Sequence, residues 1–148
     1  QRVFAEFARV LKPGGMVVIN SCSHSQLERG FWFYHLIPEA VDRVQQRTAD
    51  LDVLGSLLQH SGFGEIGHET AIDIIMQGDA YFDADRVLDP QWRDGDSIWA
   101  LATQAERDNA LQKVRTLVDE GELHRFMQRH DETRLQSGQL SFTWAVLA

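Results

Sequence analysis

Side chains that could bind a small molecule or move a proton are concentrated between residues 21 and 35. They directly follow a short apolar run at 16–19, which predicts a strand. In open α/β sheets, ligands bind outside the carboxyl ends of the strands. We therefore expect a substrate pocket here, with aromatic walls and a few polar groups that fix orientation. The residues predicted to bind substrate in this segment are Ser21, Ser23, Gln26, Trp32 and Tyr34.

Two histidines in the same segment, His24 and His35, are the candidate catalytic residues. An imidazole has an unperturbed pKa of about 6.5, so it can take a proton from an acidic substrate near neutral pH. The alternative for each is a solvated or hydrogen-bonded loop histidine. In the same way, the run Phe31–Phe33 could cover the sheet edge or pack against a helix instead of lining a pocket.

Other chemistries have little support in the sequence. Cys22 and His24 lack the second pair of ligands that a zinc site needs, and the acidic stretch 79–96 lacks the ligand order of a calcium-binding loop, so no metal site is predicted. Residues 62–67 match the pattern G-x-G-x-x-G. However, a helix is predicted before these glycines and a strand after them, whereas phosphate binding needs the opposite order. We expect them to form a helix end and a turn.

The elements that must position these residues alternate between helix and strand. An apolar stripe predicts a helix over 3–11, which ends at Lys12-Pro13-Gly14-Gly15, and the strand at 16–19 should be covered on both faces. Helices are then expected from Pro38 and from Asp50, and strands over 65–76 and 140–146. Between these strands we expect an acidic loop at 79–96, a helix that begins with the capping box Thr103–Glu106, and a helix from Leu123. This order predicts an α/β fold.

Composition limits the class of protein. The 148 residues carry 14 basic and 22 acidic side chains, a net charge of -8, and one cysteine. This balance is typical of one globular domain and argues against nucleic acid as a ligand. No apolar run is long enough to span a membrane and a lone cysteine forms no internal disulfide, so the expected location is cytoplasmic. Because the chain starts inside a helical pattern without an N-cap, we expect it to be part of a longer protein.

Three segments together resemble class I S-adenosylmethionine-dependent methyltransferases. Residues 7–19 (FARVLKPGGMVVI) are similar to the family's helix, turn and fifth strand; residues 57–63 (LLQHSGF) to the end of its final helix; and residues 141–147 (SFTWAVL) to its last, antiparallel strand. The resemblance implies a Rossmann-like methyltransferase fold, of which residues 1–148 are the C-terminal half.

The resemblance also implies how the rest of the chain is used. It assigns 21–49 to a substrate-side insertion after the fifth strand and 78–138 to a helical insertion between the last two strands. Such insertions commonly cover the family's substrate site, so Trp92 and Trp99 become candidate substrate-binding residues of a lid, or else the insertion's own small core. The family's glycine-rich turn and acidic cofactor-binding residue have no counterpart here, so no cofactor-binding residue is assigned.

The expected function is methyl transfer from S-adenosylmethionine to a small-molecule acceptor by the intact protein, with the isolated chain binding the cofactor poorly. The alternative is a non-catalytic module. A sheet that is cut after a few strands leaves an unpaired edge, and such edges favour pairing with a partner or with a second copy, which would give a homodimer.

Overall fold

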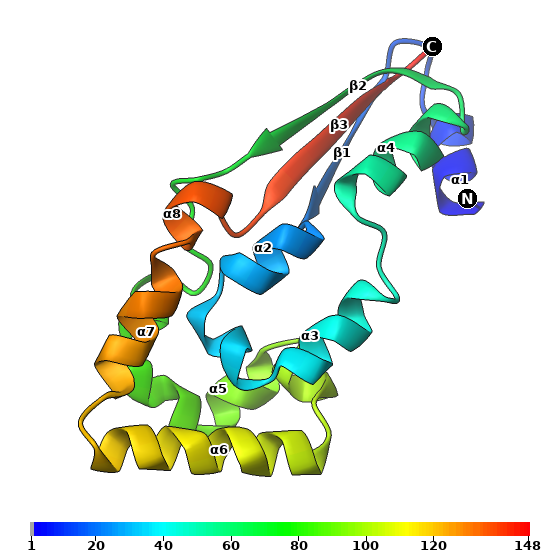
Figure 1. The fold of residues 1–148 in the computed structure, drawn as a ribbon. Coiled ribbons are helices and arrows are strands. Elements are labelled where there is room, and N and C mark those ends of the chain that lie inside the picture. The colour runs from blue at the N-terminus through cyan, green and yellow to red at the C-terminus, as the bar shows by residue number, and fades with distance from the viewer. Residues whose placement is uncertain (1) are drawn as a thin grey trace.

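The structure, a computed structural model, describes residues 2–148 as a mixed α/β arrangement with a small sheet and a larger helical body (Figure 1). The strands are β1 (Met16–Ser21), β2 (Phe63–Thr70) and β3 (Ser141–Leu147). The α-helices are α1 (Arg2–Val10), α2 (His24–Arg29), α3 (Pro38–Gln45), α4 (Leu51–Gln59), α5 (Pro90–Gly95), α6 (Gln104–Asp119), α7 (Leu123–Asp131) and α8 (Arg134–Ser137). Short 3-10 helices are η1 (Trp32–Leu36), η2 (Gly78–Phe82), η3 (Ala84–Leu88) and η4 (Trp99–Leu101).

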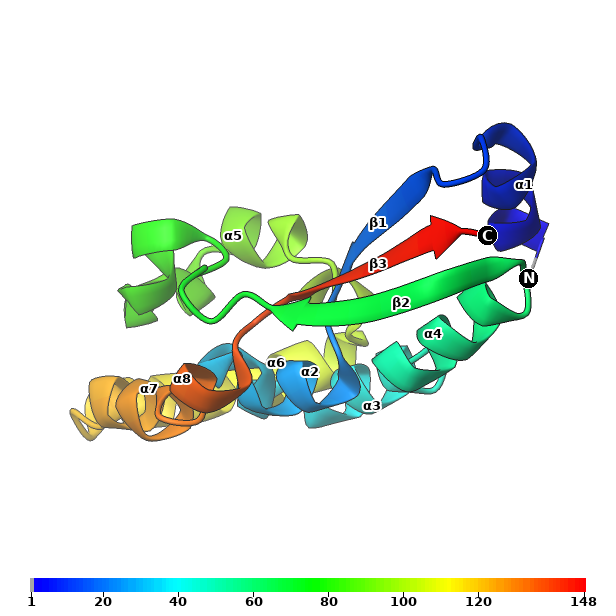
Figure 2. The same cartoon turned by 90° about the horizontal axis from the view of Figure 1, so that it is seen from above.

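The sheet has the order β1-β3-β2, and β3 is antiparallel to both neighbours, so β1 and β2 run parallel (Figure 2). The prediction of a strand over 65–76 was wrong for its second half, because β2 ends at Thr70. Thr70 lies opposite Ser141, the first residue of β3, and beyond this pair β2 has no partner strand to bond with. Three strands are fewer than the larger Rossmann-like sheet would have, so that sheet stays a prediction.

Helices α1 and α4 pack on one face of the sheet. Their apolar side chains form a core with inward-facing residues of all three strands, in which Leu58, Phe63 and Ala145 are buried. The opposite face at β1 is open: Met16 is 54% exposed and Val18 is 57% exposed. Within residues 2–148, the expectation that this strand is covered on both faces is therefore wrong. Its apolar run reflects one covered face and one that no element of residues 2–148 covers.

The turn between α1 and β1 requires glycine at two positions. Gly14 has φ of 76°, a left-handed conformation that favours glycine, and its N–H donates to the carbonyl of Leu147 at 2.9 Å. At Gly15, a Cβ atom would lie only 2.8 Å from the carbonyl oxygen of Lys12. The turn thus closes tightly and ties the start of β1 to the end of β3.

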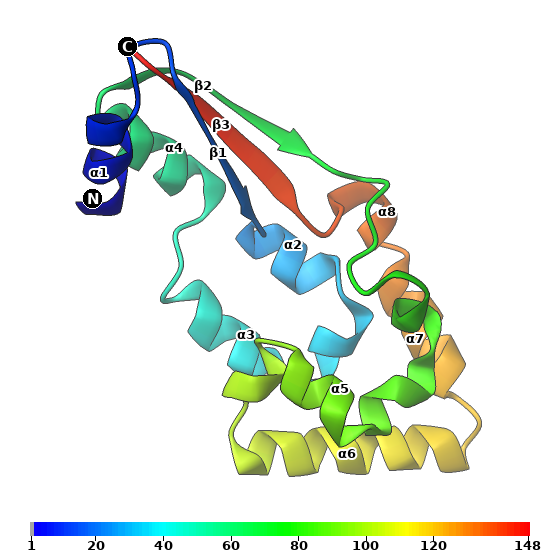
Figure 3. The same cartoon turned by 180° about the vertical axis from the view of Figure 1, so that it is seen from behind.

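The helical body has its own core, to which both predicted insertions contribute. Phe31, Trp32 and Phe33 are all buried in it, and residues from η2, η3, η4, α6 and α7 complete it. Figure 3 shows α6 along the margin of this body that is farthest from the sheet. The segments 21–49 and 78–138 therefore form one packed unit.

The acidic stretch 79–96 is not the loop that was predicted but consists of η2, η3 and α5. Tyr81 of η2 and Ala84 and Val87 of η3 are buried and recur at every third position, the spacing at which side chains of a 3-10 helix share one side. The acidic residues between them concealed this period.

Several helix-start predictions are confirmed. Pro38 occupies the first turn of α3, Asp50 caps α4, and Thr103 and Glu106 form a capping box at α6. Among residues 2–148, no helix combines the length and apolar character that crossing a membrane requires.

Candidate small-molecule pocket between α2 and α3

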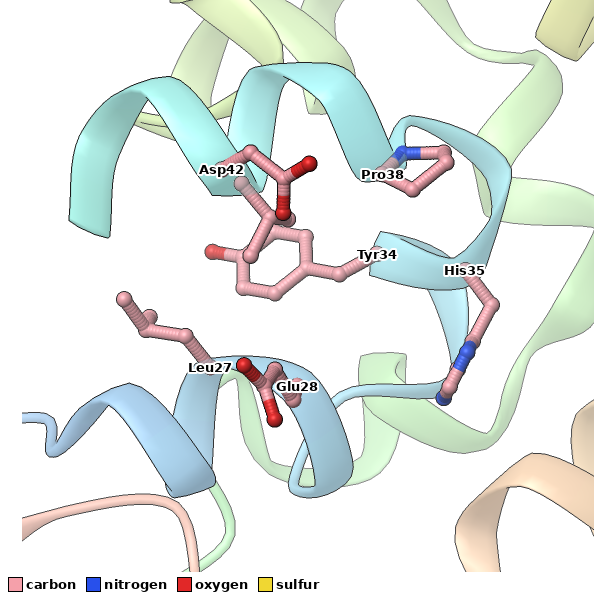
Figure 4. Close-up of a pocket in the computed structure, with 7 residues that line it drawn as sticks. Leu27, Glu28, Tyr34, His35, Pro38 and Asp42 are labelled. Atoms are coloured by element: carbon pink, nitrogen blue, oxygen red, sulfur yellow. The ribbon is translucent and has the colours of Figure 1, made fainter. Parts of the chain in front are cut away.

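A pocket of about 180 Å³ opens between α2 and α3 (Figure 4). Its floor is apolar, and it also carries two carboxylates, an imidazole and a phenol. The residues that line it are Leu27, Glu28, Tyr34, His35, Pro38, Val41 and Asp42. Two of the residues predicted from the sequence, Tyr34 and His35, therefore meet in one cavity.

Local sequence explains why this pocket forms. Ser23 caps α2, and the buried aromatic run fixes η1 immediately after it. Pro38 then starts α3, because its fixed φ suits the first helical position. The chain consequently reverses direction within residues 30–38, and Tyr34 and His35 lie at the bend between the two helices.

The Tyr34 hydroxyl donates a hydrogen bond to the partly buried carboxylate of Asp96, at 3.1 Å from Oδ2. Backbone N–H groups of Ile98 and Trp99 donate to the same carboxylate, each at 3.0 Å. Burial raises the pKa of Asp96, and burial together with the Asp96 charge raises the pKa of Tyr34 far above its usual range. Tyr34 therefore stays protonated, and its ring is held rigidly at the pocket.

His35 stacks on His130 of α7, with ring centroids 4.0 Å apart and planes 29° apart. Phe126 packs against the other histidine, with its centroid 4.4 Å from that of His130. Burial, followed by the positive charge of Lys113, lowers the pKa of His35, while burial and the neighbouring His35 lower the pKa of His130 to about 4. Both rings are neutral at pH 7, so His35 can offer the pocket a hydrogen-bond donor or acceptor without a charge.

The mouth of the pocket is acidic. Glu28 and Asp42 lie on opposite sides of it, one from each helix (Figure 4). The carboxylate of Glu28 accepts a hydrogen bond from Nε2 of Gln45 at 2.9 Å. A second depression of about 190 Å³ shares His35 and Pro38 with the pocket and extends toward α6.

The structure places four of the other predicted residues away from this cavity. Ser21 ends β1, and its buried Oγ has no hydrogen-bond partner among residues 2–148. Ser23 and Gln26 form the capping box of α2, and the Gln26 side chain also donates to the carbonyl of Ser137 at 3.0 Å. His24 lies 3.1 Å from the carbonyl oxygen of Thr48 through Nε2. These contacts give Ser23 and Gln26 structural roles.

The three predicted tryptophans belong to the core of the helical body. Trp32 is buried and donates from Nε1 to the carbonyl of Tyr81 at 2.9 Å. Trp99 is buried, and the partly buried Trp92 packs edge-on against Phe33 with ring centroids 4.9 Å apart. Of the two alternatives for Trp92 and Trp99, a lid or a small core, these contacts favour the core.

Sequence reasoning missed two pocket residues, Glu28 and Asp42, and it missed that His130 stacks on His35 behind the pocket. The sequence places His130 on the inward face of its helix but does not indicate a partner for it. Its partner His35 lies far away in the sequence, and no local signal links the two. The heptad-like spacing of Leu123, Phe126 and His130 does predict that His130 faces inward.

The described residues 2–148 contain no group of three or more metal-ligating side chains that could hold an ion. The glycines at 62–67 have structural roles. The N–H of Gly62 donates to the carbonyl of Gln59, and the Trp144 indole lies where a Cβ of Gly67 would be. Neither is free to receive a phosphate.

Comparison with known proteins found no matching family model, no matching curated protein and no matching solved structure.

Proposed function

We propose that this chain is the acceptor-side part of a Rossmann-like, S-adenosylmethionine-dependent methyltransferase that acts on a small molecule. The order of the elements supports this proposal. A helix, a Pro-Gly-Gly turn and β1 are followed by α4 and β2, and the last strand, β3, is antiparallel to both others. The same order underlies the resemblance in the sequence.

The observation that carries the proposal is that β1 is an edge strand with an exposed apolar face. Its outer edge has no partner strand among residues 2–148, and one face of it exposes Met16 and Val18. Apolar runs of this kind are typical of strands inside a larger parallel sheet, where both faces are covered. In a larger parallel sheet, a further strand would pair this edge, and helices packed on the sheet would cover this face.

The residues present do not fit the cofactor itself. The glycines that match a nucleotide-binding pattern are not free to bind a phosphate, because Trp144 packs against Gly67 and Gly62 lies at the end of a helix. We therefore derive no chemical step through S-adenosylmethionine. The part that we assign to this chain is to bind and orient the acceptor between α2 and α3, against the fixed ring of Tyr34 and the neutral imidazole of His35.

The test starts from the coding sequence upstream of the Gln1 codon. We expect an in-frame strand, a glycine-rich turn and an acidic residue about 20 positions later. The protein that includes them should bind S-adenosylmethionine in isothermal titration calorimetry. An upstream stop codon, or no binding by the longer protein, would refute the proposal.

A second candidate function, self-association, is favoured by the same open edge. Met16–Ser21 contains no charge and no proline, the features by which edge strands commonly avoid pairing. Two copies of β1 could pair about a twofold axis and extend the sheet, since such an interface is self-complementary. On this reading the chain is a homodimeric, non-catalytic module.

Analytical ultracentrifugation tests this second candidate. Pairing through β1 predicts a concentration-dependent dimer that Val18→Lys disrupts. Val53→Lys on α4 is the matched control, because Val53 is similarly exposed, at 52%, and lies away from β1. A native chain that stays monomeric at high concentration, or a dimer that Val18→Lys leaves intact, would contradict it.

A further inference from the structure

We propose that the pocket between α2 and α3 binds a small organic cation, such as an alkylammonium ion, between the carboxylates of Glu28 and Asp42 and against the ring of Tyr34. This inference goes beyond the proposed function, because it concerns cation binding by the pocket and does not depend on methyl transfer. The binding itself follows from the pocket.

The first argument is the charge at the mouth. Glu28 and Asp42 come from different helices and lie on opposite sides of the same opening (Figure 4). Within residues 2–148, neither carboxylate forms an ion pair. The neighbouring cation Arg43 is bound instead to Glu106 of α6. Neither carboxylate is thus paired with a cationic side chain of residues 2–148, and the positive charge of Lys113 acts on His35 instead.

The second argument is the chemistry of the floor. Leu27, Val41 and the ring of Tyr34 offer a surface for alkyl groups, and an aromatic ring also attracts a cation that lies over its face. The Asp96 hydrogen bond fixes this ring in place, so binding costs little side-chain entropy there. An anion would meet two carboxylates, and a neutral apolar molecule would leave them unused.

The third argument is size. About 180 Å³ is smaller than the roughly 300–1,000 Å³ typical of sites for drug-sized ligands. The ligand that fits is a short alkyl chain with one charged group. His35, neutral at pH 7, adds a hydrogen-bonding group to the lining without repelling this charge.

The test is a titration of the ¹⁵N-labelled 148-residue chain with butylammonium chloride, followed by NMR at constant ionic strength. We expect saturable shifts confined to residues 27–42, with a Kd on the order of millimolar for so small a ligand. 1-Butanol, of similar size without the charge, should bind at least about tenfold more weakly, because it lacks the ion pairs and the cation–π contact.

Variants separate the pocket from the charge of the whole protein. The double variant Glu28→Gln/Asp42→Asn should weaken binding about tenfold, the loss expected for two partly exposed ion pairs. Glu65→Gln/Glu69→Gln on β2 makes the same change in charge at exposed positions and should leave the Kd unchanged. All four positions are exposed, so both variants should fold.

The proposal is overturned by any of three results: no saturable shift at residues 27–42, equal affinity for 1-butanol, or equal weakening by the two double variants. No cofactor is present in this experiment. Its failure is therefore distinct from failure of the methyltransferase proposal, which the longer protein's binding of S-adenosylmethionine decides.

Discussion

Acidification from pH 7.5 to pH 5.0 should destabilise the fold through the stacked pair His35 and His130. Burial and the adjacent His35 lower the pKa of His130 from 6.5 to about 4, and the pKa of His35 is lowered as well. In the unfolded chain both imidazoles take up protons near pH 6.5, whereas in the folded chain they stay neutral. The stabilising contribution is therefore fully present above pH 6.5 and is lost as the pH falls toward 4.

The magnitude follows from proton linkage. For His130 alone, the shift corresponds at pH 5.0 to a difference of about 2 kcal/mol between the two states if it is taken in full. Because the ring is partly exposed to solvent, we reduce this expectation to about 1 kcal/mol.

The assay is urea unfolding followed by tryptophan fluorescence at both pH values, for the native chain and for His130→Phe. Phenylalanine retains the stacking surface toward His35 and Phe126 but cannot be protonated. Between pH 7.5 and 5.0, the free energy of unfolding should fall by about 1 kcal/mol more for the native chain than for His130→Phe. His124→Phe, at an exposed position on the same helix, should lose as much as the native chain. If His130→Phe shows the same loss as the native chain, the reasoning is refuted.

Two further predictions concern the sheet and the cysteine. Gly67→Ala should destabilise the protein by about 1–3 kcal/mol in urea unfolding, because its Cβ would overlap the Trp144 indole. Gly64→Ala is the control, since its Cβ meets only ordinary contacts and should cost less. Equal losses of stability would contradict the packing argument. Cys22 should react with a thiol-specific disulfide reagent at pH 8 several-fold more slowly than a free cysteine, because burial and then the Asp96 charge raise the pKa of its thiol. Asp96→Asn should increase that rate, and an unchanged rate would remove the electrostatic part of the explanation.

Residue-level signals predicted where α3, α4, α6 and α7 start and predicted the three strands, but they did not predict α2 or α5. Asp50, Pro38 and the Thr103–Glu106 capping box act within one turn of the chain, so their effect can be read from neighbouring residues. The buried run Phe31–Phe33 was expected as core by one of two interpretations, and the structure supports that interpretation. The methyltransferase resemblance itself stays a prediction.

The sequence placed Tyr34 and His35 near a possible site because both lie in the segment that leaves the end of β1. It could not place Glu28 and Asp42 on opposite sides of one pocket, because that depends on the angle between α2 and α3. The tryptophans show the reverse problem. An aromatic residue suits a ligand pocket and a core equally well, and only the packing against Phe33 and Tyr81 distinguishes them.

The sequence by itself determined those elements whose signals are local: helix caps, the Pro-Gly-Gly turn and the alternation of the last strand. Tertiary structure alone decided which side of β1 is covered, where β2 ends, and that His35 meets His130. The physical reason is that burial, strand partners and pKa shifts depend on atoms brought together from distant parts of the chain. The pocket, its acidic mouth and its neutral imidazole exist only once those parts have packed.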